Sequence, residues 1–223
     1  KDGGLYAGSA HVGAGAGIDS GGNEFVRPNV HVEGGLGGDK GRTRMQEWAR
    51  TFGFGAPAGI DVGREETGLV PTPAWRKEAF ESDWDKAWNP GDSIQLAIGQ
   101  KDVQVTPLQM ARFYALLANG GKLVTPHLVS SVEQPGNSGA IKAVFSPAPK
   151  DVNVDPAELN VIEDGLFRAT HASYGTSAGV FGAFPVPIAG KTGTAEKAVD
   201  VDGDGYPQMV DQSWWCGYGP TDK

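Results

Sequence analysis

The sequence predicts an α+β fold in which helices pack on an antiparallel sheet. Three segments have helical patterning, and two apolar segments near the C-terminus are typical of strands joined by an acidic, glycine-bearing loop. The order of an irregular segment, helices and then an antiparallel strand pair indicates helices covering a sheet. A chain of 223 residues with 39% hydrophobic residues is long enough to bury a substantial core.

The first predicted helix lies within residues 43–55. Three apolar residues recur there at helical spacing, and two glycines follow in the C-cap region. The apolar residues are Met45, Trp48 and Phe52, and the glycines are Gly53 and Gly55. Residues 56–93 are rich in proline, glycine and tryptophan, so we expect a long irregular connection packed by aromatic side chains.

Two further helices are predicted by a polar cap followed directly by proline. Thr106 and Pro107 open a stretch that ends at the Asn-Gly-Gly run of residues 119–121, and Asp155 and Pro156 open the other. A short polar side chain accepts a hydrogen bond from the unpaired N–H groups at a helix start. Proline suits the first helical position because no N–H is needed there.

Strands are predicted from short apolar runs bounded by turn residues. Residues 122–133 indicate a strand that Pro126 confines to a sheet edge or a bulge. Residues 185–196 and 211–220 indicate the two strands of one hairpin. Residues 1–41 are glycine-rich and have little hydrophobic periodicity, so we expect an irregular segment.

Charge and cysteine content exclude several classes of function. A formal net charge of -8 argues against non-specific nucleic-acid binding, which needs a basic surface. No apolar run in the sequence is long enough to span a membrane. The single cysteine, Cys216, excludes an internal disulfide and a cysteine-rich zinc site. No cofactor is expected, and the histidines lack zinc-ligand spacing: His11, His31, His127 and His171.

The stretch "AGKTGTAE", residues 189–196, has the composition of a ligand-binding strand edge. Lys191 supplies a cation, Thr192 and Thr194 supply hydroxyl groups, and Gly193 lets a ligand approach the backbone. Such groups suit a ligand carboxylate, with strand N–H groups available for a carbonyl oxygen. The alternative is an exposed strand with an ordinary surface lysine.

Longer runs around this stretch carry a resemblance to a known family. They read "WARTFGFGAPAGIDVGREETGLVPTPAW", "WNPGDSIQLAIGQKDVQVTPLQMARFYALLANGGKLVTPHLV", "IAGKTGTAE" and "SWWCGYGP". In order and separation, residues 42 to about 220 resemble the transpeptidase domain of bacterial penicillin-binding proteins, most of all the monofunctional, class B type. The resemblance implies the penicillin-binding/β-lactamase-like fold and identifies Lys191-Thr192-Gly193-Thr194 as the family's third active-site motif.

The family implies serine acyl transfer. A serine attacks the penultimate D-alanine carbonyl of a peptidoglycan stem peptide, releases terminal D-alanine and passes the acyl group to an amine; β-lactams mimic that D-Ala-D-Ala end. By resemblance, Lys191 aids electrostatic binding of the substrate carboxylate, the Thr192 and Thr194 hydroxyls bind it, and the Thr194 N–H helps form the oxyanion hole. Expected partners are stem peptides, β-lactam antibiotics and membrane proteins of cell division or elongation. The expected location is extracytoplasmic, in a parent protein anchored in the cytoplasmic membrane.

Two other motifs of the family, Ser-x-x-Lys and Ser-x-Asn, do not occur in the sequence. Ser9 follows a glycine as the family's nucleophile does, but Val12 stands where the lysine is needed. Asn29 matches the asparagine of the second motif, but Arg27 replaces its serine. A serine without a neighbouring base is a weak nucleophile at neutral pH. The nucleophile therefore stays unassigned, with Ser9 and Asn29 as weak candidates.

These gaps predict a domain that is incomplete at both ends. We expect an irregular segment over residues 1–41 and a partial transpeptidase domain over residues 42–223, because the family's closing strand and helix are missing too. A first alternative is a non-catalytic β-lactam sensor or wall-peptide-binding domain of the same fold. A second, of a different class, is a calcium-stabilised structural domain with only incidental likeness.

The calcium alternative comes from the loop "DVDGDGYPQMVD". Asp200, Asp202 and Asp204 occupy positions 1, 3 and 5 of an EF-hand-like loop, and Asp211 occupies position 12, where a bidentate glutamate is usual. The competing interpretation is a solvated acidic turn between two strands, where Asp-Gly is common.

Three other features have structural interpretations. Glu65 and Glu66 are adjacent carboxylates, which the resemblance places in a structural turn. Lys101 follows "IGQ" where relatives often have glycine, which predicts a local change in that loop. Tryptophans are expected to serve packing rather than sugar binding: Trp75, Trp84, Trp88, Trp214 and Trp215.

Overall fold

In the computed structural model, the chain forms two compact units. The first unit comprises the chain up to Met45 together with Thr72–Ala87, and the second comprises Gln46–Pro71 and Trp88–Lys223. The described residues are 10–18, 24–32, 43–135, 140–203 and 205–221. The second unit contains the apolar core and the Lys-Thr-Gly stretch.

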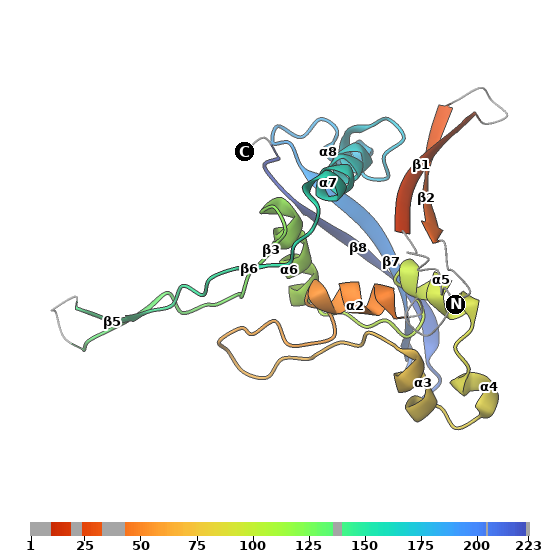
Figure 1. Ribbon diagram of the computed structural model, residues 1–223, viewed down its shortest axis with the longest axis horizontal. Helices are drawn as coiled ribbons and strands as arrows, with labels where there is room; N and C mark the ends of the chain where they lie inside the picture. Colours follow the sequence, from red (N-terminus) through yellow and green to blue (C-terminus); the bar gives the residue numbers. More distant parts are fainter. Residues whose placement is uncertain (1–9, 19–23, 33–42, 136–139, 204, 222–223) are drawn as a thin grey trace, which may run out of the picture. The chain divides into compact units, whose positions relative to one another are not determined.

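In the first unit, strands β1 (Ala10–Ile18) and β2 (Glu24–Val32) form an antiparallel hairpin, drawn in red and orange in Figure 1. This differs from the irregular segment expected over residues 1–41. Glycine is unfavourable in strands, because it loses more backbone entropy on folding than other residues and has no side chain to pack. In residues 13–17, however, glycine alternates with alanine, so the sequence keeps a period of two in residue size. The predicted boundary between residues 41 and 42 stays a prediction.

Residues 56–93 are not one irregular connection, so that prediction is wrong. They contain α3 (Pro73–Ala79) and α4 (Asp83–Lys86), and α5 (Pro90–Ala97) begins within them. The Thr72 hydroxyl caps α3 by accepting a 3.0 Å hydrogen bond from the Trp75 N–H. The same cap-proline signal that begins the longer helices is present here and outweighs the glycine and proline content.

The three helices predicted from the sequence are confirmed as α2 (Arg44–Thr51), α6 (Pro107–Ala118) and α7 (Pro156–His171). The Thr106 hydroxyl accepts from the Gln109 N–H at 3.1 Å. The Asp155 carboxylate accepts from the Ala157 N–H at 2.8 Å. A short helix, α8 (Ala178–Phe181), follows α7. None of the helices in the described ranges is both long and apolar enough to cross a bilayer.

The predicted C-terminal hairpin is confirmed as β7 (Ala189–Val199) and β8 (Gln208–Tyr218), which pair along their full length. Helix α7 packs along β7, and α6 packs along β8 (Figure 1). Burial of apolar side chains between these elements supplies the main stabilisation of the unit. The buried members of this core are Leu116, Leu117, Leu123, Val152 and Leu159.

The strand predicted over residues 122–133 is split into two short pieces. β3 (Lys122–Leu123) pairs with β6 (Lys150–Asp151), and β4 (Ser131–Glu133) pairs with β5 (Ile141–Val144). Proline between the pieces cannot donate to a strand ladder, which ends the pairing there. Every sheet among the described residues has two strands, and each of these strand pairs is antiparallel.

Candidate functional site

The Lys-Thr-Gly-Thr stretch lies in the first half of β7, as the sequence predicts. In register with β8, Lys191 lies opposite Cys216, and Thr194 lies opposite Ser213. Burial raises the pKa of the Cys216 thiol, which keeps that thiol protonated at neutral pH. Lys191 therefore has no anionic partner at the facing position of β8, and its charge is available to a ligand.

Lys191 is exposed, and its ammonium contacts the next residue of its own strand. Its Nζ donates to the carbonyl oxygen of Thr192 at 3.0 Å and to the Thr192 hydroxyl at 2.9 Å. The Thr192 hydroxyl in turn donates to the Thr176 hydroxyl at 2.9 Å. An ammonium has three N–H donors, so this arrangement keeps capacity for a carboxylate. Lys191 thus stays at the strand edge as part of a short polar chain.

Two backbone carbonyls of the motif bond to side chains. The Thr192 carbonyl accepts from Lys191, and the Thr194 carbonyl accepts a 2.9 Å hydrogen bond from the side-chain amide of Gln100. In an antiparallel pair, the N–H and C=O of one residue point to the same side, and successive residues alternate. The N–H groups of Thr192 and Thr194 therefore face the edge of β7 that no other strand in the described ranges covers.

Two glycines of β7 have different surroundings. A Cβ atom at Gly190 would lie 2.5 Å from the Trp215 ring and 2.7 Å from the Cys216 carbonyl oxygen, so packing requires glycine there. At Gly193 the nearest atom would be the Trp214 Cβ at 3.5 Å, an ordinary contact. Gly193 is therefore dispensable for packing, and its missing side chain keeps the strand open to a ligand.

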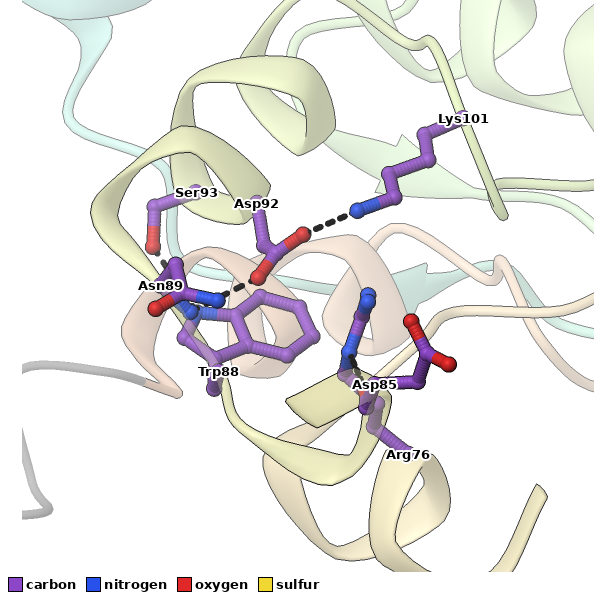
Figure 2. A network of polar contacts seen from close by, with 7 residues as sticks. All are labelled: Arg76, Asp85, Trp88, Asn89, Asp92, Ser93 and Lys101. Atoms are coloured by element: carbon purple, nitrogen blue, oxygen red, sulfur yellow. Dashed lines mark hydrogen bonds and ion pairs between the residues drawn. The ribbon is translucent and has the colours of Figure 1, made fainter. Parts of the chain in front are cut away.

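An open depression of about 530 Å³ lies beside β7 in the second unit. It is lined by α5, the loop after it and one strand residue: Asn89, Gly91, Asp92, Gln95, Gln100, Lys101 and Glu196. Figure 2 shows Lys101 reaching toward Asp92, with which it forms an ion pair. The buried Asp92 carboxylate also accepts a 2.7 Å hydrogen bond from the Asn89 backbone N–H. These contacts fix the loop that carries Gln100.

Figure 2 also draws a contact that belongs to the first unit. The buried Arg76 side chain donates from Nε to the backbone carbonyl of Asp85, which joins α3 to α4. This contact is a structural tie between two short helices.

The two candidates for the missing motifs have no described side-chain geometry. Ser9 lies outside the described residues. Asn29 lies on β2, opposite Gly13 of β1. Their assignment to the nucleophile motifs stays a prediction.

The acidic loop uses its carboxylates for turn structure. Both carboxylate oxygens of Asp200 accept backbone hydrogen bonds, from Gly203 at 2.7 Å and from Gly205 at 3.0 Å. Asp211 lies on β8 opposite Glu196 rather than in the loop. Within the described part of the chain, which excludes Asp204, no group of three His, Cys, Asp or Glu side chains is placed to hold a metal ion. The calcium alternative therefore gains no support from these contacts.

The remaining structural expectations are confirmed for Glu65 and Trp215 and wrong for Trp84. The Glu65 carboxylate accepts from the Ala58 and Gly59 N–H groups at 3.1 and 2.7 Å, which is the expected structural turn. The Trp215 ring packs on Phe181 with centroids 4.6 Å apart. The expectation of packing is wrong for Trp84, which is 85% exposed.

Two residues of the site were not predicted. Gln100 is separated from Thr194 by 94 positions, so no local pattern indicates their contact. Thr176 lies in a glycine- and serine-rich passage that has no strong secondary-structure signal. The signal available for Gln100 was its place in the "IGQ" run that carries the family resemblance.

Comparison with known proteins decides the family. A family model described as "Penicillin binding protein transpeptidase domain" matches residues 34–223. The chain belongs to this family. It is 30% identical over 192 residues to peptidoglycan D,D-transpeptidase MrdA of Haemophilus influenzae, covering 82% of this chain and 28% of that protein. It is 31% identical over 200 residues to MrdA of Acinetobacter baumannii, covering 84% and 28%.

Solved structures of the family confirm the predicted α+β penicillin-binding fold. Penicillin-binding protein 2 of Helicobacter pylori, in a complex with MreC, superposes with a TM-score of 0.62 at 27% identity, covering 79% of this chain and 29% of that one. Penicillin-binding protein 2B of Streptococcus pneumoniae also gives a TM-score of 0.62 at 27% identity, covering 88% and 29%. The chain thus spans less than a third of the length of these family members.

Proposed function

We propose that the protein containing this chain is a serine peptidoglycan D,D-transpeptidase that acts outside the cytoplasmic membrane and binds β-lactams. One observation carries the proposal. The motif from Lys191 to Thr194 lies on a strand edge whose outward N–H groups belong to Thr192 and Thr194. The names of the curated family members, peptidoglycan D,D-transpeptidase, support the same reaction.

In this proposal, the β7 edge binds the substrate at two points. The positive charge of Lys191 and the Thr194 hydroxyl bind the terminal carboxylate of the stem peptide, because charge-assisted hydrogen bonds are the strongest available. The Thr192 hydroxyl joins them by turning its one proton from Thr176 to the carboxylate. The N–H of Thr194 donates to the carbonyl oxygen under attack. That oxygen gains negative charge in the transition state, so a donor fixed in advance lowers the barrier.

The covalent step is an acyl transfer. A serine oxygen forms an ester bond with the penultimate D-alanine carbonyl carbon, the amide bond to terminal D-alanine breaks, and the serine proton goes to the leaving amine. An acceptor amine then attacks the ester, forms the cross-linking amide and returns the proton to serine. No serine in this sequence has lysine three positions on, so we expect the attacking serine outside residues 1–223.

The proposed partners follow from the substrate and from the family. Stem peptides and β-lactams share the carboxylate and the reactive carbonyl that the β7 edge is suited to bind. A membrane protein of cell division or elongation is the proposed assembly partner. The complex of the Helicobacter pylori family member with MreC supports this class of partner.

The experiment is labelling with fluorescent penicillin, with the full-length protein and a Lys191→Ala variant. We expect the full-length protein to be acylated and the variant to react on the order of 10–100 times more slowly, because the carboxylate loses its cation. Lys142→Ala is the matched control, because Lys142 is also an exposed strand lysine but lies on β5. Its labelling rate should not change.

Two outcomes would contradict the proposal. If the full-length protein takes no label, the non-catalytic wall-peptide-binding alternative replaces it. If Lys191→Ala reacts as fast as the unaltered protein, the strand does not bind the carboxylate. Stable label on residues 1–223 alone would place the nucleophile inside this chain.

A further inference from the structure

The loop after α5 contacts β7 at the edge of that strand that does not pair with β8. The side-chain amide of Gln100 donates a 2.9 Å hydrogen bond to the carbonyl of Thr194. Because the N–H and C=O of one strand residue point to the same side, this amide lies on the edge at which the Thr194 N–H emerges. Gln100 therefore contacts the backbone of the very residue whose N–H is proposed to bind the reacting carbonyl.

The conformation of the loop is fixed on both sides of Gln100. Gly99 and Lys101 both have left-handed φ values, 69° and 67°. Glycine adopts this conformation freely, but a residue with a Cβ atom does so at a cost. The Gln100 backbone N–H also donates to the Gln95 carbonyl at 2.9 Å, which closes the turn at the end of α5.

The Lys101 side chain offsets the cost of its backbone conformation. Its ammonium forms an ion pair with the Asp92 carboxylate, of which only 4% is exposed. Asp92 is held in turn at the start of α5 by the Asn89 N–H (Figure 2). A buried carboxylate is costly without a partner, so the pair favours one loop conformation. Gln100 is thereby presented to β7 by a loop with a defined shape.

We propose that Gln100 is a positioning residue for acyl transfer, which holds the Thr194 backbone so that its N–H points at the reacting carbonyl oxygen. This inference rests on the proposed function. Gln100 itself does not touch the substrate in this scheme. Its contribution is to restrict the backbone of Thr194 before the substrate binds, and preorganisation of this kind acts on the transition state more than on ground-state binding.

The test compares Gln100→Met with Gln95→Met in the full-length protein. Methionine keeps the length of the side chain and removes the N–H donor. Gln95 is the matched control, because it lines the same depression and is exposed, but has no bond to β7. Acylation by fluorescent penicillin is followed at several concentrations, which separates the limiting acylation rate from the half-saturation concentration. Thermal melting is measured on each variant.

The expected result is a selective loss of rate. Gln100→Met should lower the limiting rate about 3- to 10-fold, the effect of one hydrogen bond, and leave half-saturation within about 2-fold. Gln95→Met should behave as the unaltered protein, and neither variant should lower the melting midpoint by more than about 2 °C. Gln100→Glu, which places an acceptor against the Thr194 carbonyl, should lose more rate than Gln100→Met.

The outcomes separate this inference from the proposed function. An unaltered protein that takes no label overturns both. A labelled protein whose Gln100→Met variant reacts at the same limiting rate overturns the positioning role alone. Equal rate losses in Gln100→Met and Gln95→Met, or a loss that appears only as a lower melting midpoint, would also contradict it.

Discussion

The second unit contains two antiparallel hairpins that are held in different ways. The β7–β8 hairpin is tied to other elements at both ends of its motif. The Thr170 hydroxyl donates to the Ile188 carbonyl at 2.6 Å just before β7 begins, and Gln100 donates to Thr194. The Thr176 hydroxyl contacts the motif between these points.

The β4–β5 hairpin lies at the end of a two-stranded arm (Figure 1). Its apolar side chains are solvent-exposed, with Ile141 at 61% and Val144 at 66%. Among the described residues, the Asp61 carboxylate ties the segment before β4 to the rest of the unit by accepting from the Leu128 and Val129 N–H groups at 2.8 and 2.9 Å.

The difference shows that the backbone of β7 is held in place more firmly than the β4–β5 arm. A strand that must present an N–H to a reacting carbonyl needs a fixed backbone. Side chains from three other segments contact β7 or the residue before it: Gln100 at the Thr194 carbonyl, Thr176 at the Thr192 hydroxyl and Thr170 at the Ile188 carbonyl. In the described residues, β4 and β5 contact mainly each other, so the position of the arm matters less to the proposed chemistry.

The largest expected effect comes from the glycines of β7. Gly190→Ala should lower the free energy of unfolding by about 1–3 kcal/mol, because its Cβ would collide with Trp215 and the Cys216 carbonyl. Gly193→Ala should change it by about 0.5 kcal/mol or less, because its nearest contact is an ordinary one. Chemical denaturation measures both.

Penicillin labelling also distinguishes Gly193 from Gly190. Gly193→Ala should retain its stability but lose penicillin acylation, because a methyl group then occupies the face that a ligand approaches. Equal destabilisation by the two alanines would show that the close approach of Gly190 to β8 does not control stability. Normal acylation of Gly193→Ala would place the ligand elsewhere.

A smaller effect is expected at the tie of the β4–β5 arm. Hydrogen bonds from the Leu128 and Val129 N–H groups lower the pKa of Asp61 below its ordinary value of 3.8. Because the folded-state pKa is the lower one, the stabilisation is present above pH 3.8 and is lost as the pH falls through the folded-state value. Asp61→Asn removes this titration.

Hydrogen exchange measured by mass spectrometry checks this tie. At neutral pH, Asp61→Asn should speed exchange of the peptide containing Leu128 and Val129 by about 2- to 5-fold, and the difference should shrink as the pH falls below 3.8. Asp164→Asn is the control, because Asp164 forms an exposed ion pair with Arg168 on α7. A pH-independent difference would contradict the role of the Asp61 charge.

Local signals predicted the parts of the fold that depend on neighbouring residues. The caps Thr106 and Asp155 located α6 and α7, and the Lys-Thr-Gly run located β7. The same cap-proline signal is present at Thr72-Pro73 and Asn89-Pro90, where α3 and α5 begin, and it outweighs the glycine and proline content around them.

The contacts that complete the site could not be predicted, because they join distant segments. The bond from Gln100 to Thr194 depends on where the loop after α5 lies relative to β7, and the pairing of Lys101 with Asp92 depends on the conformation of that loop. The sequence could show which side chains are suited to bind a carboxylate. It could not show which side chains hold the backbone between them.

A crystal structure of the full-length protein acylated by a penicillin shows directly whether β7 binds the ligand. We expect the acyl carbonyl oxygen to accept a hydrogen bond from the Thr194 N–H, and the penicillin carboxylate to lie within hydrogen-bond distance of the Thr192 or Thr194 hydroxyl, near Lys191. An acyl group whose carbonyl and carboxylate both lie away from the β7 edge would show that this edge does not bind the substrate.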